Sequence, residues 1–385
     1  MSNNNKTPAI RFKGFTDTWE QRKLGEVADI VGGGTPSTSN DDYWDGDIDW
    51  YAPAEIADQI YVASSERKIT QQGYDNSSAK MLPVGTVLFT SRAGIGKTAI
   101  LRKEGCTNQG FQSIVPHINE LDSYFIFSRS EEMKRYGETV GAGSTFVEVS
   151  GKQMANMELM MPTTMEEQVT IGSFFSTLDF LITLHQRKCD KLIQFKAAML
   201  QKMFPQNGAN KPEIRFKGFT DAWEQRKLEE VITVGNGMDY KHLSEGDIPV
   251  YGTGGYMLSV DKALSYDKDA IGIGRKGTID KPYVLKAPFW TVDTLFYCIP
   301  KEDYSLDFVY CIFQNVNWKE KDESTGVPSL SKVNINSTDV KVPTLAEQEK
   351  IGAYFAQLDN LITLHQRKCY KYKSIKAGLI RKLFP

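Results

Sequence analysis

Residues that build covalent or metal-bound frameworks are scarce in this chain of 385 residues. It has five cysteines and four histidines. No two cysteines form a CxxC pair, and the histidines are scattered along the sequence. This pattern predicts neither a disulfide framework nor a zinc site.

Long hydrophobic runs are also missing. No stretch of about 20 apolar residues could span a bilayer, and the N-terminus, MSNNNKTPAIRFKGF, lacks the apolar run of a signal peptide. With 41% hydrophobic and 24% charged residues, the chain is expected to fold into two or more globular domains. We therefore expect a cytoplasmic protein without a membrane partner.

Catalytic motifs are absent as well. The sequence has no GxSxG elbow, no HExxH motif and no fingerprint for S-adenosylmethionine. The segment 91–98, SRAGIGKT, ends like a P-loop, but Ser91 stands where that motif needs glycine. His185 and His365 lie on an apolar helical pattern, which favours packing over catalysis. The chain is predicted to have no active site and to bind no cofactor itself.

What the sequence does contain is an internal repeat. The stretch 10–27, IRFKGFTDTWEQRKLGEV, recurs at 214–231 with two differences. A second stretch, 166–205, recurs at 346–385. The chain is therefore a tandem duplication, with each unit made of a short repeat, an interior segment and a long repeat, joined by a helix-stopping linker at 206–213.

The interior segments, 28–161 and 232–342, barely align and differ in length. A recent duplication would have kept them alike too, so something holds the flanks to one design and frees the interiors. We infer that the flanks meet the same partner surface twice, whereas each interior segment meets something different.

The long repeats have the periodicity of helices. Their apolar residues are spaced alternately by four and three for more than four heptads. The first copy has Ile171, Phe175, Leu178, Ile182, Cys189, Leu192, Met199 and Met203, interrupted at His185 and Lys196; the second has Ile351, Phe355, Leu358, Ile362, Cys369, Tyr372, Leu379 and Leu383, interrupted at His365 and Lys376. Residues 171–203 would form a rod of about 50 Å.

Two such rods are expected to pack antiparallel about a pseudo-two-fold axis. Since one turn of DNA advances about 34 Å, such a rod could hold two DNA readers one or two turns apart. Long amphipathic helices are equally typical of purely structural or oligomerising elements.

The net charge of −2 argues mildly against a nucleic-acid partner, but its distribution does not. Residues 360–385 contain seven Lys or Arg and no Asp or Glu, whereas acidic residues cluster at 41–49. Basic surfaces can therefore coexist with a near-neutral total. A solvated helix face is the alternative interpretation of this basic run.

The interior segments combine short β-rich stretches with glycine-rich turns. Glycine allows close backbone approach, hydroxyl and basic side chains reach phosphates or base edges, and arginine can bind guanine with two hydrogen bonds. Each turn could also be only a turn. The candidate DNA-contacting residues are Gly33, Thr35, Ser37, Arg92, Lys97, Ser144, Tyr240, Lys241, Arg275, Lys276, Thr325 and Ser331.

The whole arrangement resembles the specificity subunits of type I restriction-modification systems. The resemblance covers essentially the entire chain and is most specific in WEQRKLGEV (19–27), GGTPS (33–37) and LITLHQRK (181–188 and 361–368). It implies an α+β fold with two globular α/β target recognition domains separated by two long antiparallel, coiled-coil-like helices. The implied boundaries are 1–161 and 214–342 for the repeat elements with their recognition domains, and 162–205 and 343–385 for the helical spacers.

The resemblance further implies a non-catalytic subunit that reads a bipartite target in double-stranded DNA. Two modification subunits, which methylate adenine with S-adenosylmethionine, would dock on the repeats, and restriction subunits that use ATP and Mg would join through them. The candidate docking residues are Trp19, Arg22, Lys23, Trp223, Arg226, Lys227, Arg187, Lys188, Arg367 and Lys368.

Two alternatives stay open. One is a coiled-coil scaffold that binds protein and not DNA. The other is a role in a related system whose partner is a fused methylase-nuclease.

Overall fold

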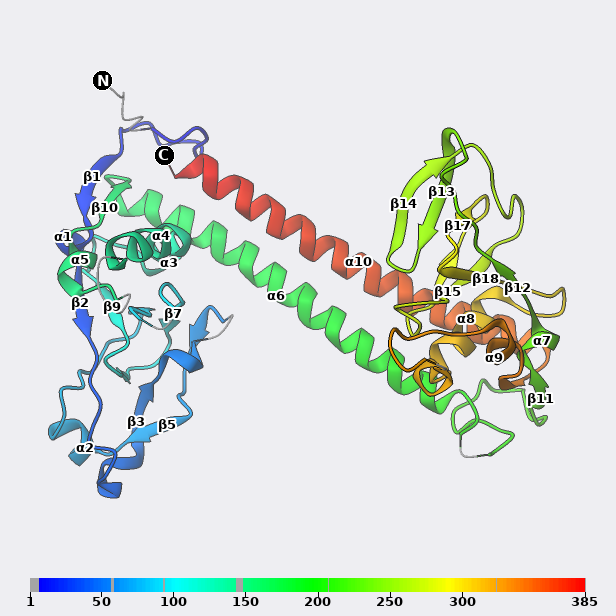
Figure 1. Cartoon of the computed structure of the whole chain (residues 1–385). Helices are drawn as coiled ribbons and strands as arrows, with labels where there is room; N and C mark the ends of the chain where they lie inside the picture. Colours follow the sequence, from blue (N-terminus) through cyan, green and yellow to red (C-terminus); the bar gives the residue numbers. More distant parts are fainter. Residues whose placement is uncertain are drawn as a thin grey trace. The chain divides into compact units, whose positions relative to one another are not determined.

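The chain forms two compact units in a computed structural model that describes residues 7–56, 59–92, 94–142, 148–206, 208–322 and 324–384 (Figure 1). Unit 1 comprises Met1–Leu184 and Lys368–Pro385, and unit 2 comprises His185–Arg367. Each unit thus holds one interior segment together with parts of both long repeats. Each compact unit therefore joins residues from separate parts of the sequence, whereas the predicted boundaries run linearly along the chain and stay a prediction.

Unit 1 is built on three sheets within its described residues. In strand order they are β1 (Glu20–Lys23)–β10 (Glu158–Met161); β2 (Ala28–Gly32)–β9 (Gln112–Pro116)–β6 (Val87–Phe89)–β7 (Thr98–Leu101)–β4 (Tyr61–Val62); and β5 (Arg67–Ile69)–β3 (Trp44–Tyr51)–β8 (Cys106–Thr107). The short helices of this unit are α1 (Leu24–Val27), α2 (Gln71–Asp75), α3 (Ser123–Phe127), α4 (Ser130–Gly141) and α5 (Gly151–Ala155).

Unit 2 repeats this plan. Its sheets are β11 (Glu224–Lys227)–β19 (Asp339–Val342); β12 (Ile232–Asn236)–β18 (Leu295–Pro300)–β15 (Ala270–Gly274)–β16 (Tyr283–Leu285); and β14 (Gly255–Val260)–β13 (Glu245–Gly252)–β17 (Trp290–Thr291). Its short helices are α7 (Leu228–Val231), α8 (Leu306–Asn315) and α9 (Lys332–Asn336). The strand order matches that of unit 1, except that unit 1 adds β4 at one sheet edge.

The shared topology is fixed by equivalent backbone contacts and by one side-chain contact that the two units make from different strands. In unit 1 the Trp50 indole, on β3, donates to the Gly34 carbonyl at 2.8 Å. In unit 2 the Trp290 indole, on β17, donates to the Met238 carbonyl at 2.9 Å. The acceptor lies two residues after the first strand of each interior segment, at Gly34 and Met238, but the tryptophan comes from different strands. The two interior segments therefore share a scaffold that a comparison of their sequences does not reveal.

The two long repeats form helices α6 (Met165–Lys202) and α10 (Leu345–Leu383). In unit 1, Lys376 Nζ lies 2.6 Å from Asp179, and Cys369 Sγ lies 4.0 Å from the Ile182 carbonyl. Partner numbers fall along α6 as they rise along α10, so the helix segments of this unit are antiparallel, as predicted. The heptad positions Ile171, Phe175 and Leu178 of this unit are buried.

The lysines that interrupt the heptad pattern are accounted for by ion pairs. Lys196 Nζ contacts Asp359 in unit 2 at 2.6 Å, the counterpart of the Lys376–Asp179 pair in unit 1. The histidines at the other interruption meet in unit 2, where His185 Nδ1 and His365 Nδ1 are 2.8 Å apart. Their expected packing role is confirmed, and so is the predicted α+β architecture with two long helices.

The end of each long repeat completes the core around the other repeat's interior segment. In unit 1, Phe384 packs against Trp19 and Phe175, with ring centroids 6.3 and 6.0 Å apart. In unit 2, Phe204 packs against Trp223 and Phe308, both at 5.5 Å. Neither unit can therefore be assembled from one repeat alone.

A buried carboxylate ties together the strands of the three-stranded sheet in unit 1. Asp49 accepts hydrogen bonds from Ser65 N, Lys68 Nζ and Lys103 Nζ at 2.8–2.9 Å, and its side chain is fully buried. Burial by itself raises the pKa of this carboxyl, but the hydrogen bonds from the two lysines and the serine outweigh it and hold the pKa well below its usual range.

Asp49→Asn is expected to destabilise the protein by about 2 kcal/mol at pH 7, because the bonds of a charged acceptor are lost. Since the pKa is lower in the folded state, this stabilisation is present above about pH 4 and is lost as the pH falls further. Urea unfolding of both proteins at pH 7 and pH 3 measures it. An equal difference at the two pH values would contradict the assignment.

Candidate nucleic-acid interface

Several predicted DNA-contacting residues of unit 2 gather around one basic pocket. The pocket has a volume of about 570 Å³ and lies where the turn after β15 meets the loop before α9. We call it the loop pocket. Its lining residues are Asn236, Arg275, Lys276, Phe296, Ser329, Leu330, Ser331 and Lys332.

Backbone hydrogen bonds fix the loops of the loop pocket, and the cationic side chains of these loops are exposed. Arg275 N donates to the Thr294 carbonyl at 2.8 Å, and Leu330 N donates to the Arg275 carbonyl at 2.9 Å. The exposed guanidinium of Arg275 lies 5.9 Å from the Phe296 ring centroid. A rigid backbone that presents exposed cations beside a flat aromatic ring is suited to a nucleic-acid ligand.

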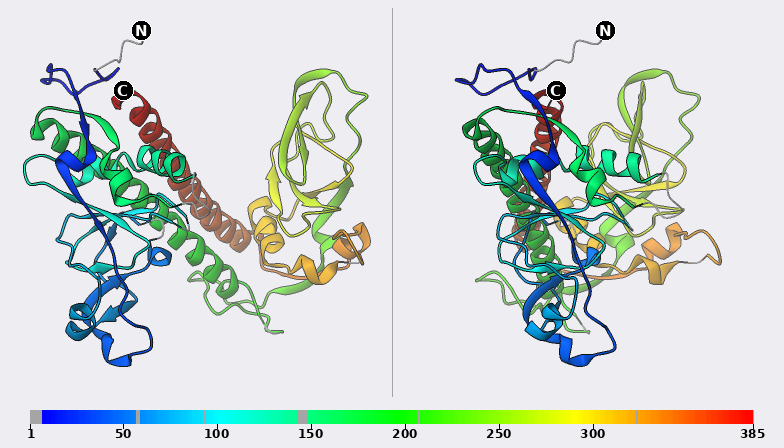
Figure 2. Two further views of the ribbon diagram at one scale, coloured as in Figure 1. Left: turned by 60° about the vertical axis from the view of Figure 1, so that its left-hand side comes forward. Right: turned by 90° about the vertical axis from the view of Figure 1, so that its left-hand side faces the viewer.

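Ser331 also lines this pocket, whereas the remaining predicted residues of unit 2 lie outside its lining. Ser331 accepts a hydrogen bond from Asn334 N at 3.1 Å and caps α9, while Thr325 is exposed in the preceding loop. Tyr240 and Lys241 line a different pocket of about 690 Å³ beside the β13–β14 hairpin, yellow-green in Figure 2. The predicted residues of unit 2 thus fall into two separate groups.

In unit 1, Arg92 is half-buried, and its backbone pairs with that of Glu148 in an isolated antiparallel β-bridge. Thr35 donates to Gln109 Oε1, and a Cβ at Gly33 would collide with the backbone carbonyls of Thr107 and Asn108. Gly33 was predicted to let DNA approach the backbone; its lack of a Cβ is needed for packing within the chain, and its contact with DNA stays a prediction.

Two further candidates of unit 1, Ser37 and Lys97, are exposed. Ser144 lies outside the described residues. Whether Ser37 and Lys97 contact DNA stays a prediction.

The docking candidates separate into buried and exposed groups. The side chains of Trp19 and Trp223 are only 1% and 3% exposed. They have no surface to offer a partner, so their predicted docking role is replaced by a role in the core. Exposed or partly exposed are Arg22, Lys23, Arg187, Lys188, Arg226, Lys227, Arg367 and Lys368.

Sequence reasoning missed exposed apolar side chains on the long helices. Phe195 on α6 is 47% exposed, and Ile375, its counterpart in the second repeat, is 37% exposed. Phe180 and Tyr370 are exposed further still, at 64% and 77%. Apolar residues beyond the seam were visible in the sequence, but their exposure depends on which helix face the recognition segments cover.

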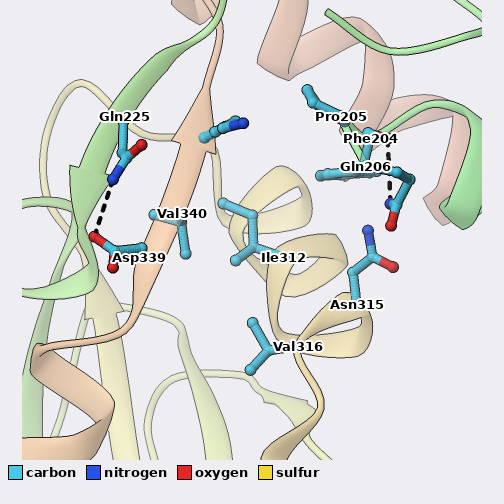
Figure 3. A pocket seen from close by; sticks show the side chains of 10 residues that line it. Phe204, Pro205, Gln206, Gln225, Ile312, Asn315, Val316, Asp339 and Val340 are labelled. Carbon is cyan, nitrogen blue, oxygen red and sulfur yellow. Dashed lines mark hydrogen bonds between the residues drawn. The ribbon is translucent and has the colours of Figure 1, made fainter. Parts of the chain in front are cut away.

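A third pocket, of about 230 Å³, lies at the end of α6 in unit 2 (Figure 3). Ile312 and Asn315 of α8 face it together with Val316, which follows that helix, and Gln225 donates to Asp339 across the β11–β19 pair at 3.3 Å. In unit 1 the corresponding place is taken by Arg129, whose guanidinium donates to Glu132 and to the Met160 carbonyl. The pocket therefore reflects a side-chain difference between two copies of one core.

Among the described residues, no cluster of three or more His, Cys, Asp or Glu side chains could hold a metal ion. No helix within them has the length and apolar character needed to cross a membrane.

A comparison with protein families shows the family of this chain. The model of the type I restriction modification DNA specificity domain matches the chain twice, over residues 16–194 and 220–371. The chain belongs to this family. The chain thus carries two copies of the specificity domain and, as the resemblance implied, two target recognition domains.

Individual relatives agree with this assignment. The chain is 31% identical to the type I restriction enzyme MjaIX specificity subunit of Methanocaldococcus jannaschii over 57% of its own length and 52% of that protein. It is 20% identical to the MjaVIII specificity subunit of the same organism over 95% and 92%. The chain spans about half the length, or less, of the first relatives that it matches. These relatives are specificity subunits, in line with the expected non-catalytic role.

A solved structure has the same fold. The S subunit of a type I restriction-modification system from M. genitalium superposes with a TM-score of 0.69, covering 98% of this chain and 99% of that one at 16% identity.

Proposed function

We propose that this specificity-family chain reads a bipartite DNA target, with one recognition domain on each half. The observation that carries the proposal is that two copies of one scaffold present different loop surfaces, and that the loop pocket of unit 2 carries three cations. Two different readers on one scaffold are what a target with two unlike halves requires. Arginine, lysine and asparagine side chains are also those that contact phosphates and base edges most often.

The repeats would dock two modification subunits. Phe195 and Ile375 occupy equivalent positions and are both exposed, so a single apolar partner surface can be met twice. Exposed cations follow the same helices at Arg187 and Arg367. Methylation of adenine with S-adenosylmethionine, and restriction with ATP and Mg, would be carried out by the partner subunits in the cytoplasm, where the DNA lies.

The test is to co-express the chain with a type I modification subunit and purify the complex. We expect a mass corresponding to two modification subunits for each chain, and duplex-DNA affinity that falls steeply with salt. Fluorescence anisotropy with a labelled duplex at several salt concentrations measures the second property. Partner binding that is insensitive to salt, without any DNA affinity, would favour the scaffold alternative.

A further inference from the structure

The loop pocket has a counterpart at the same place in the first recognition domain. Isolated bridges join Lys276 to Ser329 in unit 2 and Arg92 to Glu148 in unit 1. The next residue along each loop repeats the same bond, since Leu330 N donates to the Arg275 carbonyl and Val149 N donates to the Ser91 carbonyl. Arg92 therefore corresponds to Lys276, and Ser91 corresponds to Arg275.

Strand register extends this correspondence to the rest of the pocket. Asn236 faces Phe296 across β12 and β18, and Gly32 faces Gln112 across β2 and β9. Ser331 and Ser150 cap α9 and α5 respectively. The eight lining residues of the loop pocket thus correspond, in order, to Gly32, Ser91, Arg92, Gln112, Glu148, Val149, Ser150 and Gly151.

The backbone of this surface is shared, but its chemistry is not. Apart from the capping serine and the buried Leu330/Val149 position, the six remaining positions differ in side chain. The unit 2 set carries three cations, at Arg275, Lys276 and Lys332, whereas the unit 1 set carries Arg92 and the opposite charge of Glu148.

The unit 1 surface is built around an amide. A Cβ at Gly151 would lie 2.9 Å from Gln112 Oε1, and one at Gly32 would lie 3.7 Å from it. Gly151 leaves room for the Gln112 side chain, and Gly32 lies in ordinary contact with it. In unit 2 the flat ring of Phe296 takes its place, and Asn236 and Lys332 replace the glycines.

These substitutions change the groups that read bases. Gln and Asn pair with adenine, Arg and Lys with guanine, and Glu accepts from cytosine. Scaffold residues whose role is structural should keep their chemistry between two copies, as the capping serines do. A position held by the same hydrogen bonds but given different base-reading groups has the pattern of a specificity determinant.

We propose that this pair of equivalent surfaces determines which sequence each recognition domain selects, with Asn236 and Arg275 reading bases in the second half-site and Gln112 and Arg92 in the first. The proposal rests on the proposed function. The proposed function assigns the choice of DNA sequence to whole recognition domains, and this inference assigns that choice to individual side chains on a shared loop backbone.

The test is to map methylated adenines in host DNA that carries the full complex with single variants of this chain. Arg275→Ala and Asn236→Ala should relax discrimination by about tenfold or more at one base position of a single half-site. Gln112→Ala and Arg92→Ala should act only on the other half-site. Lys286→Ala, which removes an exposed lysine of unit 2 outside the pocket, is the matched control and should leave both half-sites unchanged.

The outcomes separate this proposal from the one it rests on. If the pocket variants weaken methylation of all sequences equally, these residues contact phosphates and the specificity assignment is wrong. If they leave a bipartite motif untouched, the assignment is again wrong while the DNA-reading function stands. If the unaltered complex yields no bipartite motif, the proposed function itself fails.

Discussion

Replacing Arg11 by alanine is expected to lower the free energy of unfolding by about 3–5 kcal/mol. Arg11 Nε and Nη2 donate to the two carboxylate oxygens of Glu167 at 2.7 and 2.6 Å. The side chain of Glu167 is only 2% exposed, and Trp19 Nε1 also donates to it at 3.3 Å. Without the guanidinium, a buried carboxylate loses its counter-charge and must stay desolvated or take up a proton.

The control for this variant lies on β1. Arg22 is 31% exposed and pairs with Glu26 at 3.2 Å and Glu120 at 3.4 Å, so Arg22→Ala should cost less than about 1 kcal/mol. Urea unfolding followed by tryptophan fluorescence compares the two variants. Equal losses would show that burial of Glu167 does not decide the outcome.

Because unit 2 has the same pair, Arg215→Ala offers an internal replicate. Arg215 donates to both oxygens of Glu347 at 2.7 Å, and Glu347 is 1% exposed. A loss of similar size is expected. The double replacement Arg11→Met with Glu167→Leu should recover most of the stability lost in unit 1, because it removes the buried charge along with its partner.

Phe204→Ala is expected to destabilise unit 2 by about 3–5 kcal/mol. The ring is 5% exposed and stacks on Phe308 at 15° between the ring planes. It belongs to the first repeat but fills the core around the second recognition domain. Its loss would therefore leave a cavity in the core of unit 2, where the end of the first long repeat packs against Trp223 and Phe308.

Phe195→Ala on α6, the helix that ends just before Phe204, is the matched control. Its side chain is 47% exposed, so the free protein should lose much less stability. Thermal unfolding of both variants measures the difference. If Phe204→Ala behaved like Phe195→Ala, the helix end would not contribute to the core as described.

The long helices and the duplication could be predicted from the sequence because their signals are periodicity and identity, which need no tertiary information. The burial of Trp19 and Trp223 could not. A residue that recurs in both repeats can contact a partner surface twice, or it can occupy the same core position in two copies of one domain. Only its exposure in the folded protein distinguishes these two roles.

The shared scaffold of the recognition domains was hidden for a different reason. Strand pairing is made by backbone groups, which leave no residue signature, and the indole that closes the first turn comes from Trp50 in one copy and Trp290 in the other. The glycine-rich turns suggested Arg92 and Arg275 as candidates but gave no correspondence between residues of the two copies. The hydrogen-bonded register shows that Arg92 corresponds to Lys276, and Asn236, Gln112 and Lys332 join the candidate site only once that register is known.

The most direct test of the central claim is to map methylated adenines in DNA exposed to the complex, before and after the interior segment 28–161 is replaced by that of another family member. A bipartite motif with a fixed gap is expected, and the replacement should change one half while the other half and the gap are kept. Methylation that lacks a bipartite motif, or a replacement that leaves both halves unchanged, would contradict the account.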